Sequence, residues 1–600
     1  MGIAVSAREI DGINYYLNFS SHTAVVQRMG AGSENYSGDI VIPASVSYNG
    51  EDYAVTRIDQ AAFSYCEGVT SIALPNTLTT IGNSAFEGTA ITSVTIPASV
   101  TTIGEKAVGN CRQLAAIIVE EGNSMFDSRE NCNALIETAS NTLLQACRST
   151  VIPESVTAIG NYAYLGCVWL TDITIPSHIQ SVAKDAFYGC SGLASVTILT
   201  PSVGSYFSGL KSIREVVLGE GVTTIGDYAF DKCTGLTTVN IPASVTSIGL
   251  YAFGNCQHLT AITFPAGLTT IGGAAFSGCK ALAAINIPAS VTSIGTQAFI
   301  ACSGLQSITV EEGNSVYDSR NNCNALINSE ENELMFGCVN TVIPNSVTAI
   351  GNDAFYDCSD ITSVYLPASV EKIGTSAFVG CRLENVVTRN PQSMIYTGTL
   401  YPFSEQTLQH AMLYVPVGTW GEAVYGNGGW YLFYNIREMA TTVREISASK
   451  AYTLMSADNY GYAVYDSGSD QVKMVRAFYG MDEADPNSYW QLVDADNGLC
   501  LYNVGAGKYA TVTAEGHLTL SATPVPITMA DGEQGVVINN VPAKQWSFVQ
   551  NNKVATDIHS TSLTTARQTE RSSAIYDLQG RRLKVKPEKG IYIQNGKKMK

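Results

Sequence analysis

One short phrase recurs along this chain at a constant spacing. It reads IGDYAF at Ile225, IGLYAF at Ile248, IGGAAF at Ile271 and IGTQAF at Ile294, so successive copies are 23 residues apart. A period of about 20–29 residues with Leu, Val and Ile at fixed places is typical of a solenoid, because a single coil cannot bury its apolar side alone. The repeat therefore predicts a core that grows coil by coil along one axis.

Each repeat divides into a strand and a bend. In residues 236–258, LTTVNIPASVTSIGLYAFGNCQH, the side chains of Val239 and Ile241 point to one face of a short strand. Pro242 ends the strand because proline has no N–H to donate. We expect Gly249 to permit a tight bend, and the Phe and Cys of each copy to fill the far side of the coil.

The recurring phrase P.SVT.IG..AF..C..L, from about residue 41 to residue 383, resembles BspA-like (treponemal-type) leucine-rich repeats. The resemblance implies a right-handed solenoid on secreted or surface proteins of anaerobic bacteria, with roles in adhesion to host proteins or other cells. We expect a mainly β chain with 23-residue coils followed by a small all-β domain. The expected parts are an N-terminal cap in 1–57, repeats in 58–390, an aromatic cap in 391–441, the all-β domain in 442–556, and a linker with a sorting-like segment in 557–600.

Two longer units are nearly identical, one from Glu120 and one from Glu311, which are 191 residues apart. The copying indicates duplication of a whole block. In each unit, apolar segments such as NALI and LLQA flank a polar turn, which predicts a β-hairpin projecting from the coil.

Fifteen cysteines could form a disulfide framework, but most of them share one phase of the repeat. We expect those in-phase cysteines to be buried thiols that behave as small hydrophobes. The hairpins offer an alternative, because Cys132 with Cys147, and Cys323 with Cys338, are expected to face each other and could bridge.

Composition and charge argue against several functions. The formal charge is −18, which disfavours a nucleic-acid partner because phosphate binding needs a basic surface. No apolar run of about 18 residues appears, so no membrane-spanning segment is expected. The six histidines fall in different units, and no Cys-x-x-Cys pair occurs. We therefore expect no catalytic site, no metal site and no cofactor.

A partner is expected to contact the outward side chains of the strand ladder, which are mostly small and polar. Such a face predicts weak contacts per coil that act through their extent, although a purely structural scaffold is an open alternative. The candidate residues are Asp172, Thr174, Thr238, Asn240, Asn286 and Tyr365.

The aromatic region after the repeats allows two interpretations. Trp420 and Trp430 could cover the last coil, or they could form a platform for a sugar. The segment LYNVGAGKYA in the following domain resembles ricin-type β-trefoil units, and a β-sandwich is the alternative. A carbohydrate-binding function of this β domain is therefore the second functional hypothesis.

The end of the chain carries YDLQGRR and KGIYI, which resemble the C-terminal sorting domain of the type IX secretion pathway. Residues 575–578 and 591–593 are expected to form two strands. The start of the chain lacks a signal-peptide pattern, which fits either a cytosolic protein or one whose leader has been removed. The two resemblances favour a secreted or cell-surface protein that binds a host or bacterial surface protein, with a glycan as the alternative partner.

Overall fold

The computed structural model describes residues 5–29, 35–390, 392, 401–425, 429–440, 451–456, 462–475, 486–495, 498–531, 536–539, 541, 545–550, 575–576, 582–583, 592–594 and 597–599. They belong to two compact units. The first comprises Met1–Leu305 with Val310–Ser315, and the second comprises Gln306–Thr309 with Val316–Lys600.

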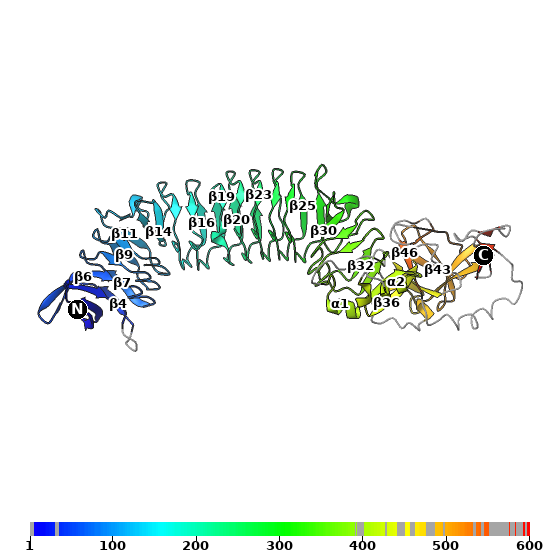
Figure 1. The fold of residues 1–600 in the computed structure, drawn as a ribbon, viewed down its shortest axis with the longest axis horizontal. Helices are drawn as coiled ribbons and strands as arrows, with labels where there is room; N and C mark the ends of the chain where they lie inside the picture. The colour runs from blue at the N-terminus through cyan, green and yellow to red at the C-terminus, as the bar shows by residue number, and fades with distance from the viewer. Residues whose placement is uncertain are drawn as a thin grey trace. The chain divides into compact units, whose positions relative to one another are not determined.

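Each repeat coil has three sides, and each side bonds to the same side of the next coil (Figure 1). One side is a long strand, as where β20 pairs with β22 and Glu215 lies beside Thr238. The second is a two-residue strand, and the third is a turn that carries the Phe and Cys. The turns also join through their backbones, since the N–H of Phe230 donates to the carbonyl of Ala252 at 2.8 Å. The predicted mainly β solenoid is confirmed.

The long strands are β4 (Ser37–Val41), β7 (Gly68–Ala73), β9 (Ser93–Ile96), β11 (Ala116–Val119), β16 (Asp172–Ile175), β18 (Ser195–Ile198), β20 (Glu215–Leu218), β22 (Thr238–Asn240), β25 (Ala284–Ile287) and β27 (Ser307–Val310). The two-residue strands are β8 (Thr80–Ile81), β10 (Thr102–Ile103), β15 (Ala158–Ile159), β17 (Ser181–Val182), β19 (Ser202–Val203), β21 (Thr224–Ile225), β23 (Ser247–Ile248), β24 (Thr270–Ile271), β26 (Ser293–Ile294), β31 (Ala349–Ile350) and β33 (Lys372–Ile373).

The phenylalanines of the repeat form a stacked row inside the first unit. The ring centroids of Phe253 and Phe276 are 5.3 Å apart, and those of Phe276 and Phe299 are 5.5 Å apart, with the ring planes nearly parallel. The side chains of Phe253 and Phe276 are fully buried. Each ring therefore finds its packing partner one period away, which is why the phrase must repeat in register.

The glycine of each phrase is needed for a different reason from the predicted bend. A Cβ on Gly249 would lie 2.7 Å from the backbone nitrogen of Asp227 in the preceding coil, and the φ of Gly249 is outside the left-handed region. Left-handed backbone instead occurs at Tyr251 (φ 49°) and Asn255 (φ 58°). Glycine is thus required by the close approach of successive coils.

The N-terminal segment forms an antiparallel meander of β1 (Val5–Ile10), β2 (Ile13–Asn18) and β3 (Thr23–Val26). Strand β3 then runs parallel to β6 (Glu51–Ile58), which joins β5 (Ser45–Tyr48) and the two-residue strands β8 and β10 in one sheet. The buried rings of Tyr15 and Tyr53 face the core of the first coils. The meander therefore covers apolar side chains that would otherwise be exposed at the first coil.

Both long units contain the predicted hairpins. In the first, β13 (Ala134–Glu137) pairs with β14 (Thr142–Ala146), and in the second β29 (Ala325–Asn328) pairs with β30 (Glu333–Gly337). Short strands β12 (Phe126–Asp127) and β28 (Tyr317–Asp318) pair with β13 and β29. Because β14 and β30 pair in parallel with the two-residue strands β15 and β31, each hairpin lies within that sheet and does not project from it.

In the second unit, the parallel ladder runs through β32 (Ser363–Leu366), β34 (Asn385–Thr388), β35 (Met412–Pro416) and β36 (Asn435–Ala440). Two short helices, α1 (Glu405–His410) and α2 (Trp420–Tyr425), lie between these strands in sequence. Helix α1 begins after Ser404, whose hydroxyl accepts a hydrogen bond from the N–H of Thr407.

The remaining strands are antiparallel among the residues described. β36 pairs with β46, and β46 pairs with β37, which leads through β40, β41 and β42 to β43. Trp490, the first residue of β40, and Trp546, the second residue of β46, are buried in this core. The strands are β37 (Ala451–Ser456), β38 (Tyr462–Asp466), β39 (Gln471–Val475), β40 (Trp490–Ala495), β41 (Gly498–Asn503), β42 (Lys508–Val512), β43 (Leu518–Ser521), β44 (Met529–Asp531), β45 (Val536–Ile538) and β46 (Gln545–Gln550).

The C-terminal segment contributes a small sheet of its own. Strand β47 (Ile575–Tyr576) pairs antiparallel with β49 (Tyr592–Gln594), as the two expected strands would. Strands β48 (Arg582–Leu583) and β50 (Lys597–Met599) lie at its edges. Leu578 and Ile591, which were also expected to be in strands, lie outside the described residues.

Candidate interaction surfaces

The outward face of the long-strand ladder in the first unit brings four predicted residues together. Strand register aligns Asp172 with Ser195, Glu215 and Thr238 in one row across β16, β18, β20 and β22. Thr174 and Asn240 stand at the two ends of the next row, two residues along the same strands. Asp172, Thr174, Thr238 and Asn240 are all exposed. This part of the ladder is therefore an accessible polar surface.

The ladder row of Asp172 also carries unbalanced negative charge. Asp172 and Glu215 are both exposed, and neither has an ion-pair partner among the residues that the structure describes. Asn286 of β25 is exposed as well, and its side chain donates to the carboxylate of Glu311 at 3.0 Å. The outward face thus presents carboxylates and small polar groups.

Tyr365 does not belong to this accessible surface, contrary to the sequence prediction. It stands on the outward face of β32 but is only 8% exposed. It packs with Val387 and Tyr414 of the neighbouring strands and with Met455 of β37 and Val549 of β46. The antiparallel strands of the second unit cover the ladder here, so Tyr365 stabilises that contact.

The two tryptophans of the aromatic region have different environments. Trp430 is fully buried beside Phe403 and Phe433, so it fills the end of the core and cannot be a sugar platform. Trp420 begins helix α2 and is 44% exposed, while its backbone N–H donates to Glu438. Of the two interpretations, the sugar platform is therefore wrong for Trp430, which fills the core as a cap residue would.

All fifteen cysteines are buried thiols in the structure. The hairpin register pairs Ala134 with Ala146, which places Cys147 beside Asn133 and leaves Cys132 one position out of line. The Cys147 thiol accordingly donates to the carbonyl of Asn133 at 3.0 Å.

The duplicated hairpin shows the same offset. The Cys338 thiol donates to the carbonyl of Asn324 at 3.3 Å, and the Cys323 thiol is directed to the carbonyl of Ala325. Neither predicted bridge is formed, because the one-residue offset aims each thiol at a backbone carbonyl.

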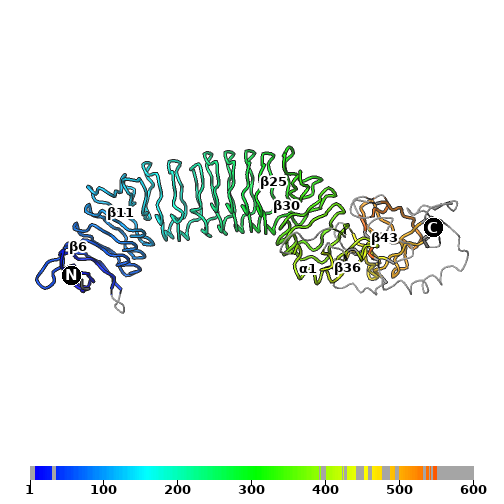
Figure 2. Tube along the Cα trace, in the orientation of Figure 1, coloured from blue at the N-terminus to red at the C-terminus, as the bar shows by residue number. Residues whose placement is uncertain are grey.

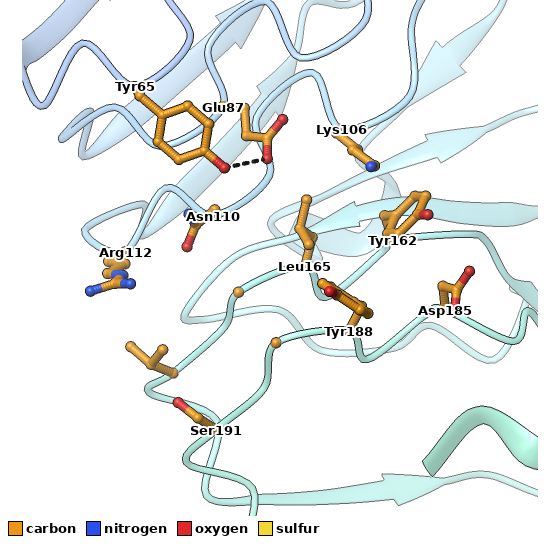
Figure 3. Close-up of a pocket in the computed structure, with 13 residues that line it drawn as sticks. Tyr65, Glu87, Lys106, Asn110, Arg112, Tyr162, Leu165, Asp185, Tyr188 and Ser191 are labelled. Atoms are coloured by element: carbon orange, nitrogen blue, oxygen red, sulfur yellow. Dashed lines mark hydrogen bonds between the residues drawn. The ribbon is translucent and has the colours of Figure 1, made fainter. Parts of the chain in front are cut away.

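A surface groove that the sequence did not predict crosses the turns of the first unit. We call it the tyrosine groove, after Tyr65, Tyr162 and Tyr188, and its volume is about 550 Å³. Figure 3 shows Leu165 in the middle of the groove, with Tyr162 and Lys106 towards one end and Arg112 towards the other. Tyr188 is 63% exposed and Tyr65 is 52% exposed, so both rings are accessible.

The groove depends on the hairpin unit. The turn that contains Asn110 lies directly beside the turn that contains Leu165, since the N–H of Asn110 donates to the carbonyl of Leu165 at 2.8 Å. The intervening residues form β11 to β15 on other sides of the coils, where Figure 2 traces them in blue to cyan. Turns that are far apart in sequence thus supply one surface.

Specific contacts hold the groove side chains. The ammonium of Lys106 lies 3.9 Å from the ring centroid of Tyr162, and the ring of Tyr162 meets that of Tyr188 edge to face at 6.3 Å. The Tyr65 hydroxyl donates to the carboxylate of Glu87 at 3.0 Å, a hydrogen bond that, together with burial, raises the pKa of Tyr65. These contacts fix the rings without covering them.

Other site types are absent from the described part of the chain. Among those residues, no three His, Cys, Asp or Glu side chains lie close enough to hold a metal ion. Within the same ranges, no helix is long and apolar enough to cross a membrane.

The model of the BspA type leucine-rich repeat region matches residues 51–145, 144–243, 202–327 and 335–427. Since these matches cover more than half of the sequence, the chain belongs to the BspA-type leucine-rich repeat family. Curated proteins gave no match.

Solved structures similar to this chain also carry leucine-rich repeats. One from Bacteroides ovatus is 24% identical over 72% of this chain and 99% of its own, with a TM-score of 0.42. A leucine-rich cell surface protein from Faecalibacterium prausnitzii is 24% identical over 72% and 95%, with a TM-score of 0.26. The leucine-rich repeat protein of T. pallidum is 27% identical over 38% and 82%, with a TM-score of 0.23.

Proposed function

We propose that this chain is a secreted or cell-surface protein that binds protein partners through the outward face of its long-strand ladder. Membership of the BspA-type family supports a scaffold role, and the resemblance of the terminal segment to a sorting domain supports export. The observation that carries the proposal is the accessible polar ladder of β16 to β22, with its rows of small side chains. Its mechanism would be many weak contacts along successive coils and no chemical step.

Charge narrows the class of partner. Asp172 and Glu215 stand in one exposed row, and the whole chain carries a formal charge of −18. Opposite charges steer association and fix register at an interface. We therefore propose a partner that presents Lys or Arg side chains to this row.

The experiment immobilises the full chain and a double variant, Asp172→Lys with Glu215→Lys, and passes surface extracts of bacterial and epithelial cells over both. Proteins that bind the wild-type ladder should be retained at about 50 mM salt and released at about 500 mM, because salt screens exposed charges. The double variant should not retain them. A matched control, Glu67→Lys with Glu154→Lys, makes the same charge change at exposed positions outside these strands and should bind normally. Equal retention by both double variants would contradict the proposal.

A further inference from the structure

The tyrosine groove differs from the rest of the turn surface in a way that the fold does not require. The duplicated block repeats the scaffold of this region 191 residues later, where Ala163, Phe187 and Cys190 recur as Ala354, Phe378 and Cys381. These repeated side chains are buried. Buried core side chains of the region therefore recur in both copies.

The side chains that face the groove are not repeated. At the equivalent positions of the duplicated block, Lys106 is replaced by Gln297, Tyr162 by Asp353, and Tyr188 by Val379. They occur beside core positions that recur, since Ala107 is repeated as Ala298 and Phe187 as Phe378. Because the same coil forms without them, the aromatic and charged side chains of the groove are not needed for folding.

The chemistry of the groove is amphipathic and electrically balanced. Lys106 and Arg112 contribute two positive charges, and Glu87 and Asp185 contribute two negative charges. Arg112 and Asp185 have no ion-pair partner among the described residues, so their planar polar groups are available to a ligand. Such a lining offers no net attraction to an ion, but it offers several hydrogen-bonding groups beside exposed rings.

The backbone of the groove has little to offer a peptide strand. The N–H of Gly88 donates to the carbonyl of Gly109 at 3.0 Å, and the N–H of Gly166 donates to that of Tyr188 at 2.9 Å. A peptide that adds to a sheet needs unpaired backbone groups, and these groups are already paired. The recognition must therefore come from side chains.

We propose that the tyrosine groove binds an uncharged oligosaccharide chain. The C–H faces of sugar rings would lie on the exposed rings of Tyr65 and Tyr188, while sugar hydroxyls would bond to Arg112 and Asp185. The five turns that line the groove give room for several sugar rings in a row. This site is separate from the ladder face, so it adds a second specificity to a protein-binding scaffold.

The test is calorimetric titration of the full chain with cellohexaose, xylohexaose, mannohexaose and maltohexaose. At least one of these should bind, with a Kd of about 0.1–1 mM. The variants Tyr188→Val and Tyr65→Ala should weaken that binding about tenfold or more, since each removes one ring. Tyr188→Val copies the residue of the duplicated block, so it should leave the melting temperature unchanged.

Two controls separate the groove from the rest of the surface. Tyr251→Ala changes a tyrosine that stacks on Tyr228 in other turns and should bind normally. The ladder variant Asp172→Lys with Glu215→Lys should also keep sugar binding, which separates this proposal from the ladder function. The proposal is overturned if no neutral hexasaccharide binds, if the groove variants bind as well as wild type, or if polygalacturonate or decaproline binds more tightly.

Discussion

The thiol of Cys256 donates a hydrogen bond to the carbonyl oxygen of Phe230 in the preceding coil, with Sγ and O 3.2 Å apart. The same bond recurs between Cys233 and Phe207, Cys279 and Phe253, and Cys302 and Phe276. The cysteine of the repeat was expected to act only as a small hydrophobe. It also joins successive turns, which explains why it keeps its phase as strictly as the phenylalanine.

Replacing Cys256 with alanine should therefore destabilise the first unit. Cys256→Ala removes the donor to Phe230 and leaves a small cavity, so the free energy of unfolding should fall by about 1–2 kcal/mol. Urea unfolding followed by circular dichroism measures the change. The exposed substitution Thr174→Ala serves as the control and should change it by less than about 0.5 kcal/mol. An unchanged stability for Cys256→Ala would show that the thiol bond contributes nothing.

Alkaline pH should destabilise the fold through these thiols. Burial raises the pKa of Cys190, Cys233 and Cys358 to about 12, whereas a thiol in an unfolded chain has a pKa of about 8.5. The unfolded chain therefore loses protons first, so the contribution of these thiols to the free energy of unfolding should be constant below about pH 8.5 and fall as the pH rises towards 12.

Alkylation at pH 8 measures directly whether these thiols are buried and protonated in the native chain. The native chain should react slowly with iodoacetamide, because its thiols are buried and protonated. In urea without a reductant, all fifteen cysteines should react. Rapid reaction of the native chain would contradict the burial of these thiols, and fewer than fifteen modified cysteines in urea would reveal a disulfide.

The close approach of coils predicts a strong effect at Gly249. An added methyl group would lie 2.7 Å from the nitrogen of Asp227, and the opposing atoms are backbone, so Gly249→Ala should cost about 2–3 kcal/mol of stability. Gly221→Ala is the matched control, because its added Cβ would meet only the carbonyl of Leu199 at 3.7 Å. Comparable melting temperatures for the two variants would argue that the coils can move apart.

Substitutions in the covered part of the ladder should lower the free energy of unfolding, whereas substitutions in the exposed part should not. Tyr365→Ala should lower the free energy of unfolding of the second unit by about 3 kcal/mol, since it empties a packed cluster. Thr174→Ala stands at an outward ladder position of the first unit that is exposed, and should have little effect. Differential scanning calorimetry compares the two, and a neutral Tyr365→Ala would mean that the antiparallel strands do not stabilise the ladder.

The sequence was informative wherever a side chain meets its own copy one period away. Phe253 and Phe276 pack on each other, so their spacing alone predicted the solenoid and the buried row. Gly249 was recognised as necessary, but the reason depends on the distance to Asp227 in another coil, which a single repeat does not contain.

The sequence was misleading or silent for residues that contact side chains from other parts of the chain and not their own copies one period away. Tyr365 occupies an outward position, and only the later apolar residues Val387 and Tyr414 at equivalent positions could have signalled that this face is covered. The tyrosine groove was missed because Lys106 and Tyr162 are far apart in sequence. Their turns are neighbours only because the hairpin unit between them adds no turn to this surface. The non-repeating tyrosines among repeating core residues were the available signal.

Photo-crosslinking from a single position tests most directly whether the ladder binds protein partners. The full chain carries p-benzoylphenylalanine at Asn240 on the outward face, or at Tyr251 on the turns, and is illuminated with cell-surface extract. We expect protein adducts from position 240, fewer of them after the Asp172→Lys with Glu215→Lys change, and few adducts from position 251. Adducts that form from position 251 and not from position 240 would contradict a ladder that binds protein partners.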